Sequence, residues 1–271
     1  MMPSRGQPSR RLAGLDSPVR SGKKSRWLIG AAGFAVLIAV WQLLTATLAS
    51  GNVEWPTPWS IVSLMHSDGW RFYWPNVQTT MWEAIKGFFW GNLVAIALAL
   101  LILLVPVIEK PLVQLSMISY CLPIVAIGPV LAVSFSGEQP KAILAGMAVF
   151  FTTLIGMLVG LRSADSTSLD VIRAFGGGRY QMLVKVRLKA SLPSLFGALR
   201  IAAPAAVLGA IIGEYLGGDN GLGVAMINSE QSLNIARTWG IALVATALAG
   251  LGYAVVAAVG RAVTPWTRAA S

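Results

Sequence analysis

The pattern of apolar and polar positions along this chain consists of long apolar runs separated by shorter polar segments. A helix that crosses the hydrocarbon core of a bilayer needs about 20 mostly apolar residues. Pro123, Gly128 and Pro129 interrupt the third such run, but breaks of this kind are tolerated where neighbouring helices or water satisfy the freed backbone groups. The pattern predicts an all-α, polytopic membrane protein with six transmembrane helices, over residues 27–49, 87–108, 117–135, 142–160, 196–216 and 238–259.

The polar segments divide the chain into a membrane domain and two tails. Residues 1–26 are rich in Arg, Lys, Ser, Pro and Gly, which predicts a disordered, basic cytoplasmic tail. The apolar run that follows is too long for a signal-peptide core, so we interpret it as the first span. The membrane domain is expected over residues 27–260, and a short tail over residues 261–271. The Trp- and Pro-rich residues 50–82 are typical of a segment that rests at the outer membrane interface.

Composition leads to the same class of protein. Hydrophobic residues make up 55% of the 271 residues and charged residues 12%, whereas a soluble domain carries roughly 25% charged residues. The net charge of +10 does not indicate nucleic-acid binding, because the Lys and Arg residues lie between apolar spans. The single cysteine, Cys121, excludes an intrachain disulfide and is expected to be a buried, inert thiol. With one histidine besides, metal catalysis is not expected, and no cofactor is predicted.

The distribution of basic residues predicts the orientation, because Lys and Arg favour the cytoplasmic side of a membrane protein. If the N-terminus is cytoplasmic, the inner segments hold 16 Lys and Arg residues and the outer segments hold 4. Arg200, the remaining one, lies just inside the fifth span. We therefore expect both termini in the cytoplasm, with cytoplasmic segments at residues 1–26, 109–116, 161–195 and 260–271.

The 161–195 segment is the longest predicted cytoplasmic loop, and a loop of this length usually has a structure or function of its own. Residues 168–175 favour a helix, which Asp165 or Ser166 can cap. Gly176 and the two glycines that follow it end this helix and permit a sharp turn. The loop thus begins as a helix followed by a glycine turn.

A second helix is predicted over residues 180–188, because Met182, Leu183 and Val186 recur at spacings of three and four. Pro193 is expected to restart the chain toward the fifth span. On charge alone, the loop fits either a surface that touches anionic lipid or a surface with a more specific role.

The order of residue types in this loop resembles the EAA loop in the permease subunits of bacterial ABC importers. That pattern reads Glu-Ala-Ala, three residues, Gly, nine residues, Ile or Val, one residue, and Leu-Pro. Here Asp170 stands in the place of the Glu, and Gly176 in the place of the Gly. Val186 and Leu188 follow at the family's spacing.

The loop departs from the family pattern at residues 170–172, which read DVI, and at Lys189, which replaces the Pro. A second Leu-Pro that is common in one subgroup is present and ends at Pro193. The resemblance extends over about residues 55–260, and is closest to permeases of the nitrate, sulfonate and taurine group. The segments that carry it are WPTPWSIV, GFFWGN, YCLPIVAIGPVLAVSF, LPSLFGALRIA and GEYLGGDNGLG.

The resemblance implies a type I importer fold and a division of labour among subunits. A periplasmic or lipid-anchored substrate-binding protein would deliver the ligand, and two permeases, either two copies of this chain or this chain with a homologue, would form the path. ATP-binding subunits, expected as a dimer, would drive the cycle. This chain is expected to be no enzyme, because RSGKKS at residues 20–25 has Ser17 where a phosphate-binding loop needs its first glycine. It would lie in the bacterial inner membrane, in contact with lipid.

In this resemblance the loop couples the permease to the ATP-binding subunit. Phe175, Met182 and Leu183 are expected to be apolar anchors, since buried aromatic and aliphatic side chains carry most interface energy. Arg173, Arg179 and Lys185 would add charges at the rim. The predicted coupling residues are Asp170, Arg173, Phe175, Gly176, Gly177, Arg179, Met182, Leu183, Val186, Leu188 and Pro193.

Glu214 is the only acidic residue within the six predicted spans, near the outer end of the fifth. An ionisable group there is costly and usually functional. It can line the translocation path, brace a partner permease, or extend to the interface. Gly209, Gly213 and Gly217 recur every four residues on the same span, a stripe that permits close helix packing and fits permease pairing or a sliding gate.

Two other classes of membrane protein compete with the permease. A stand-alone secondary transporter or channel would need ion sites within the spans, for which Glu214 is the only acidic candidate, and it would leave the 161–195 loop unexplained. A membrane-embedded enzyme lacks a recognisable catalytic arrangement in the sequence. The transported substrate does not follow from the sequence, because specificity in such systems largely resides in the external binding protein.

Overall fold

A computed structural model describes residues 23–47 and 55–268, and all regular elements among them are helical. Five helices are long and apolar enough to cross a membrane, and a bent pair of shorter helices makes a sixth if it counts as one span. The prediction of an all-α, polytopic membrane protein is therefore confirmed. The first 51 residues and the remainder of the chain form two units, which are described separately.

The first unit contains one described helix, α1, over Lys23–Thr47. Its candidate span, Ile29–Thr47, agrees with the first predicted span. The helix includes residues 23–26, the last four residues of the predicted tail. Residues 1–22 lie outside the described residues.

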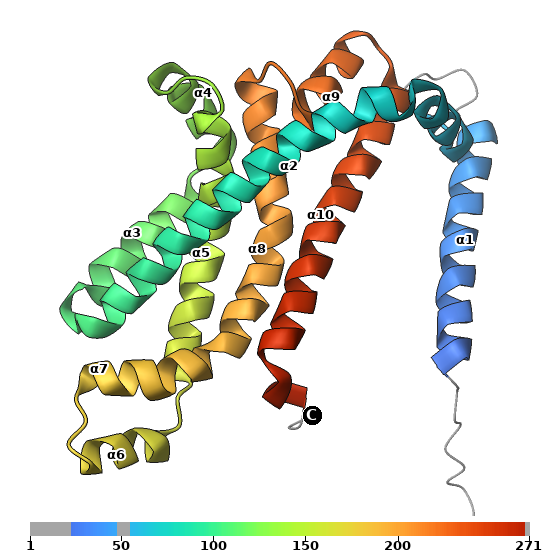
Figure 1. Ribbon diagram of the computed structural model, residues 1–271. Coiled ribbons are helices and arrows are strands. Elements are labelled where there is room, and N and C mark those ends of the chain that lie inside the picture. The colour runs from blue at the N-terminus through green and yellow to red at the C-terminus, as the bar shows by residue number, and fades with distance from the viewer. Residues whose placement is uncertain (1–22, 48–54, 269–271) are drawn as a thin grey trace, which may run out of the picture. The chain divides into compact units, whose positions relative to one another are not determined.

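The second unit begins with α2, a 47-residue helix over Pro58–Leu104 (Figure 1). Thr57 caps it by accepting a hydrogen bond from the Ser60 N–H, and Gly69, with φ +64°, introduces a kink. The segment predicted to rest at the interface is thus mostly helical and continuous with the second span. Its place at the outer interface stays a prediction; Trp and Pro do not exclude a helix, and Pro58 occupies the first turn, where proline is tolerated.

The third predicted span is a bent pair of helices, α3 over Glu109–Cys121 and α4 over Ile124–Ser134. Their axes differ by 94°, and the break falls at Leu122 and Pro123, where a proline was expected to interrupt the span. Residues 109–116, predicted as a loop, belong to α3 after the short 3₁₀ turn η1, Pro106–Ile108. The Cys121 side chain is exposed on the surface of this chain, so the prediction of a buried thiol was wrong.

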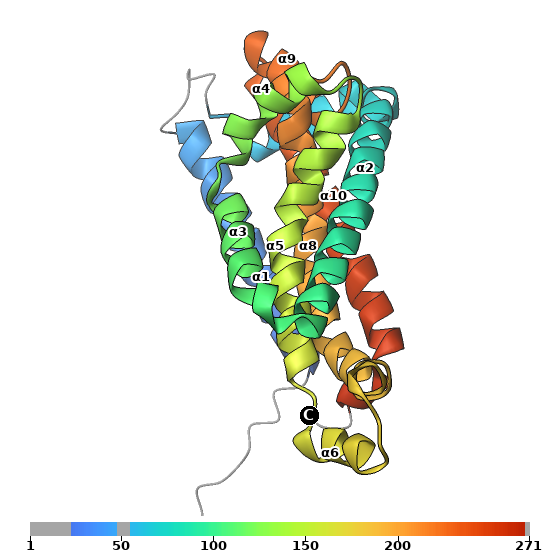
Figure 2. The same cartoon turned by 90° about the vertical axis from the view of Figure 1, so that its left-hand side faces the viewer.

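The core of the second unit lies along α5, over Gln139–Arg162, which packs against α2 on one side and α8, over Leu188–Gly217, on the other (Figure 2). Small residues allow these close approaches. A Cβ added to Gly209 would lie 2.7 Å from the Ala145 Cα, and one added to Gly160 would lie 2.8 Å from the Ser191 Cα. The helices therefore meet backbone to backbone, as small-residue stripes in membrane helices permit.

Between α5 and α8 the chain forms α6, over Ser166–Ala174, then α7, over Arg179–Met182, and the π-helical segment η2, over Leu183–Arg187. From α7 onward the helix is continuous into α8, giving one 39-residue helical stretch. The expectation that Pro193 restarts the chain was wrong. Pro193 lies inside α8, and membrane helices tolerate internal prolines when neighbouring groups take over the freed backbone carbonyl.

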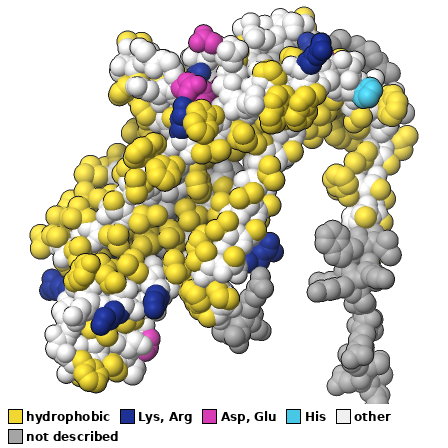
Figure 3. Space-filling view, in the orientation of Figure 1, with side chains coloured by type: hydrophobic (Ala, Val, Ile, Leu, Met, Phe, Trp, Pro, Cys, Tyr) yellow, Lys and Arg dark blue, Asp and Glu magenta, His cyan; other side chains and the backbone are white. Residues whose placement is uncertain are grey.

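The last elements close one end of the unit. α9, over Leu222–Gln231, follows α8, and α10, over Ile235–Val263, runs back along α8 and α2 before the 3₁₀ turn η3, Pro265–Arg268. Arg237 at the start of α10 makes two hydrogen bonds, of 2.8 and 2.7 Å, to the Asp68 carboxylate of α2. Figure 3 shows that hydrophobic side chains cover most of the bundle's face, as expected for a surface that meets lipid.

The tight packing of α8 against α5 leads to a first prediction. The Gly209→Ala variant should lose about 1–3 kcal/mol of stability, because the new methyl group overlaps the α5 backbone. Gly197, on the same helix, has no neighbour within 4 Å of an added Cβ, so Gly197→Ala is expected to leave stability unchanged or raise it by up to about 1 kcal/mol. The thermal midpoint in detergent, followed by tryptophan fluorescence, measures both. Equal midpoints for the two variants would contradict this packing.

Candidate functional site

The loop between α5 and α8 begins with a capped helix. The Asp165 carboxylate accepts hydrogen bonds from the Ser168 N–H, at 2.9 Å, and the Ser168 hydroxyl, at 3.1 Å. These bonds favour the charged carboxylate and lower the pKa of Asp165. Of the two predicted caps, Asp165 is the one confirmed. Asp170 pairs with Arg173 at 2.7 Å, but both side chains are exposed, so this pair contributes little stability.

The glycine turn ends α6 in a Schellman motif. The Gly177 N–H donates to the Ile172 carbonyl at 2.8 Å, and the Gly176 N–H donates to the Arg173 carbonyl at 2.9 Å. Gly176 has φ +75°, a conformation that side chains with a Cβ rarely adopt. At Gly177 the constraint is space, since an added Cβ would lie 2.7 Å from the Ile172 carbonyl oxygen. The predicted turn is confirmed, and two adjacent glycines are required for different reasons.

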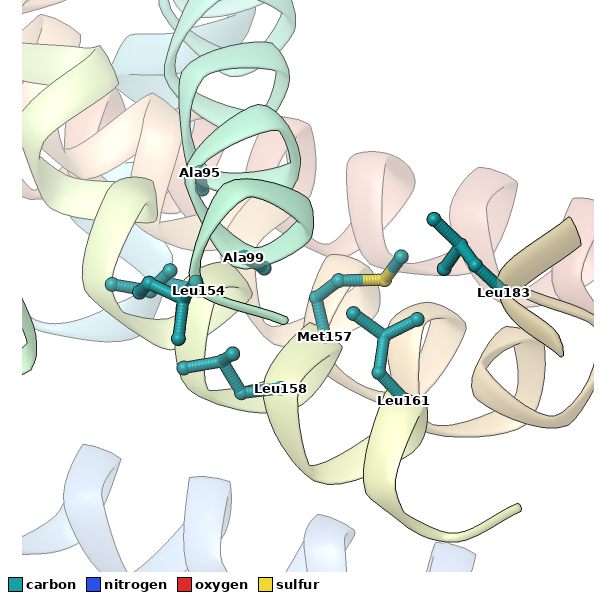
Figure 4. Packing of buried hydrophobic residues seen from close by; sticks show 8 residues of the cluster. Ala95, Ala99, Leu154, Met157, Leu158, Leu161 and Leu183 are labelled. Carbon is teal, nitrogen blue, oxygen red and sulfur yellow. The ribbon is translucent and has the colours of Figure 1, made fainter. Parts of the chain in front are cut away.

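The three predicted apolar anchors lie in different surroundings. Phe175, at the end of α6, is 88% exposed. Met182 is half-buried, and Leu183 is only 6% exposed because it packs with Met157 and Leu161 of α5 (Figure 4). The expectation that Leu183 is an anchor for a partner was wrong in this respect, because its side chain already fills the chain's own core. It joins the loop to the membrane bundle instead.

The other predicted coupling residues lie on two faces of the continuous helix, one exposed and one turned toward the bundle. Arg179 and Lys185 are exposed, whereas Val186, Leu188 and Pro193 are half-buried. Leu188 packs against the same core cluster as Leu183. The second helix of the loop is therefore a surface extension of α8 with its apolar side turned inward.

The opposite end of the bundle contains a buried polar cluster around Glu214. The Glu214 side chain is 1% exposed, and its two oxygens accept hydrogen bonds from the Thr80 hydroxyl, at 2.6 Å, and the Gly223 N–H, at 2.7 Å. The Thr80 oxygen accepts from the Leu222 N–H, at 2.9 Å, and Asn76 accepts from the Gly221 N–H, at 3.2 Å. The first N–H groups of α9, which have no partner within their own helix, are thus satisfied by α2 and α8.

A buried ion pair adjoins Glu214. The Lys141 Nζ, at the start of α5, lies 3.1 Å from the Glu83 Oε1, and Glu83 is completely buried. Neither carboxylate oxygen of Glu83 accepts a well-aligned hydrogen bond within the part of the chain that the structure describes. Glu83 interacts electrostatically with Glu214 as well as with Lys141, so this part of the core holds two acidic side chains and one lysine.

Glycines make room for this cluster. A Cβ on Gly221, which has φ +122°, would overlap the Glu214 carboxylate, and one on Gly223 would lie 2.9 Å from the Glu214 Cβ. On α8 itself, an added Cβ at Gly213 would lie 2.8 Å from the Lys141 Cα, whereas one at Gly217 would meet only Ala132 at an ordinary 3.7 Å. Two of the three glycines in the predicted stripe therefore pack within this chain.

The sequence interpretation missed most of the cluster. Glu214 is buried, so the possibility that it extends to the interface was wrong, and it is not the only acid in a span, because Glu83 lies inside α2. Lys141 was counted in an outer segment and Glu83 was not considered, because the predicted spans began just after these two residues. The sequence does contain a signal for this pair. An acidic and a basic residue that each directly precede an apolar run can pair when both helices begin about one turn earlier than the apolar run.

Comparison with known proteins identifies the family. The model of the family described as binding-protein-dependent transport system inner membrane component matches residues 91–269. A probable ABC transporter permease protein of Haemophilus influenzae is 29% identical over 201 residues, which are 74% of this chain and 82% of that protein. The formylaminopyrimidine transport permease protein ThiX of Halalkalibacterium halodurans is 23% identical over 236 residues, 87% of this chain and 94% of that protein.

The putative aliphatic sulfonates transport permease protein SsuC of Bacillus subtilis is 26% identical over 213 residues, which are 77% of this chain and 76% of that protein. This chain belongs to the family of binding-protein-dependent transport system inner membrane components. It is a membrane permease subunit of an ABC importer, similar to the sulfonate-type permeases among others. The stand-alone transporter or channel that the sequence left open is therefore not supported.

Proposed function

We propose that the loop between α5 and α8 transmits the motion of a separate ATP-binding subunit to the membrane helices, and that ATP hydrolysis takes place in that subunit. The observation that carries this proposal is the position of Phe175. It is a large apolar side chain, 88% exposed, at the end of a capped helix and beside a Schellman turn. A large aromatic side chain that is exposed on a well-formed helix end is a typical interface anchor.

The way the loop joins the bundle supports a coupling role. Leu183 is buried between α2 and α5, and the helix that contains it continues into α8. A displacement of the α7 end of the loop would therefore act directly on helices that pack in the bundle. Among the predicted coupling residues, Phe175 and Met182 remain candidates for direct contact, with Arg173, Arg179 and Lys185 at the rim.

The remaining partners and the orientation follow from the same proposal. The side of the membrane that contains α6 and α7 would be the cytoplasmic side of a bacterial inner membrane, with both chain termini there. A second permease, identical or homologous, would complete the path, and an external binding protein would deliver the substrate. Because the named relatives include permeases for formylaminopyrimidine and for aliphatic sulfonates, we propose that the binding protein selects the substrate.

Cross-linking at the Phe175 position tests the docking surface. In a Cys121→Ser background, the Phe175→Cys variant should cross-link to the ATP-binding subunit of the same importer when the two proteins are expressed together. Val133 of α4 is equally exposed, at 91%, and lies at the end of the bundle away from α6 (Figure 2), so Val133→Cys is the matched control. A complex that purifies intact but cross-links from neither position, or equally from both, would contradict the proposal.

A further inference from the structure

A basic cavity lies where the membrane bundle meets the α6–α7 loop. Its volume is about 300 Å³, at the lower end of the range for small-molecule sites, about 300–1,000 Å³. Four arginines and a single acid, Glu109 of α3, line it. The arginines are Arg162 of α5, Arg173 of α6, Arg179 of α7 and Arg187 of η2. Figure 3 shows Lys and Arg side chains gathered near α6 and α7 on the face it presents.

The acids nearby do not balance this charge. Arg162 pairs with Glu109 at 2.6 Å, and Arg173 pairs with Asp170 at 2.7 Å. Within residues 23–47 and 55–268, Arg179 and Arg187 make no side-chain hydrogen bond or ion pair. Two unpaired guanidinium groups that line one concave surface provide several donors in fixed forks, the geometry that matches phosphate oxygens.

The rest of the cavity wall is apolar and belongs to the membrane bundle. The end of α2, from Ile102 to Leu104, lines it along with Pro106, Met182 and Leu183. Directly beside this wall in the chain, Val105 and Val107 are 42% and 88% exposed. A ligand in the cavity would meet cationic groups at one side and exposed apolar surface at the other, so an amphiphile fits better than a free inorganic anion.

We propose that this cavity binds the phosphate headgroup of an anionic phospholipid, with Arg179 and Arg187 as the main phosphate contacts. Basic pockets at the membrane surface, between helices, commonly bind such headgroups. The apolar end of α2 would border the acyl chains. An acidic segment of a protein partner is the competing occupant, but it would leave the exposed apolar residues beside the cavity uncovered.

Lipid retention by the purified protein tests the proposal. The protein is extracted in mild detergent and exchanged into mixed micelles that contain phosphatidylglycerol or phosphatidylcholine, and bound lipid is counted by native mass spectrometry. The unmodified protein should retain phosphatidylglycerol selectively. The Arg179→Gln, Arg187→Gln double variant should retain it at least fivefold less.

The control variant is Lys185→Gln, Lys189→Gln, which also removes two positive charges. Both lysines are exposed on the same continuous helix, and neither lines the cavity. It should retain lipid as the unmodified protein does. The Arg179→Lys, Arg187→Lys variant should show intermediate retention, because lysine binds phosphate as a point charge without the bidentate fork. This second variant keeps the charge and therefore checks that any loss does not come from misfolding.

Four outcomes would overturn the proposal. If the arginine-to-glutamine and the lysine-to-glutamine variants lost phosphatidylglycerol to the same extent, the retention would reflect only the overall positive charge of the helix. Equal retention of phosphatidylglycerol and phosphatidylcholine would show a hydrophobic contact only. Full displacement of the lipid by 10 mM inorganic phosphate would assign the cavity to a free anion. If the Arg179→Gln, Arg187→Gln variant retained lipid normally but no longer co-purified with the ATP-binding subunit, the cavity would belong to the protein interface.

Discussion

The Gly176→Val variant is expected to insert normally and to lose at least tenfold in transport. Gly176 has φ +75°, where a residue with a Cβ costs about 1–2 kcal/mol and a β-branched residue costs more. A Cβ added at Gly176 meets no neighbour within 4 Å, and the turn lies outside the membrane bundle, so we expect the bundle to stay folded. The strain instead opens the Schellman turn and changes the direction in which Phe175 points. Uptake of the transported substrate in cells, with the membrane level of the protein measured in parallel, gives the result.

Two substitutions separate backbone strain from side-chain bulk. Gly176→Asn should keep most of the transport activity, because asparagine tolerates positive φ better than other residues do. Gly178→Val is also expected to be mild, since Gly178 has φ −83° and open space around it. If Gly176→Val transports normally, or if Gly178→Val is equally inactive, the turn at Gly176 does not set the coupling geometry.

The Lys141→Met variant is expected to lose about 3–5 kcal/mol of stability, the usual result of removing one partner from a buried ion pair. Glu83 and Glu214 would remain buried without the ammonium group between α2, α5 and α8. The same change loosens the region where α9 is held, so the fraction of protein that survives detergent extraction should fall with the thermal midpoint. Size-exclusion chromatography and tryptophan fluorescence measure both.

The double variant Lys141→Met, Glu83→Met is the matched comparison. It removes both charges of the pair with side chains of similar length, and Glu214 keeps its hydrogen bonds from Thr80 and Gly223. We expect it to recover at least half of the stability that Lys141→Met loses, because a buried pair can often be replaced by apolar residues at little cost. If the double variant were less stable than Lys141→Met alone, Glu83 would stabilise the fold through interactions other than its pair with Lys141.

The membrane spans could be predicted from the apolar runs because a hydrophobic segment of this length has few alternatives to a transmembrane helix. The ends of the helices could not be predicted in the same way. α2 begins 29 residues before the predicted span at Gly87, since the preceding segment mixes Trp, Pro and polar residues whose helical structure depends on packing against α9 and α10. That extension is what places Glu83 within a candidate membrane span.

The candidate sites show a similar division. The turn at Gly176 could be predicted because its chemistry is local, in a glycine after a capped helix. The burial of Leu183 could not, because an apolar helix face looks the same whether it packs on its own chain or on a partner. Glu214 was recognised as unusual, but its partner Thr80 lies 134 positions away and carries no distinguishing pattern.

The helical stretch from Arg179 to Gly217 connects the two candidate sites, with α7 lying across the direction of α8 at one end (Figure 1). At 1.5 Å per residue, the 30 residues of α8 span about 45 Å. A tilt of α8 by about 5° about its α7 end would displace the other end by about 4 Å, which approaches the pitch of one helical turn. A small rotation imposed at the α7 end would therefore become a larger displacement at Glu214, where α9 is attached, and the π-helical segment, Pro193 and Pro204 are points at which this stretch can bend.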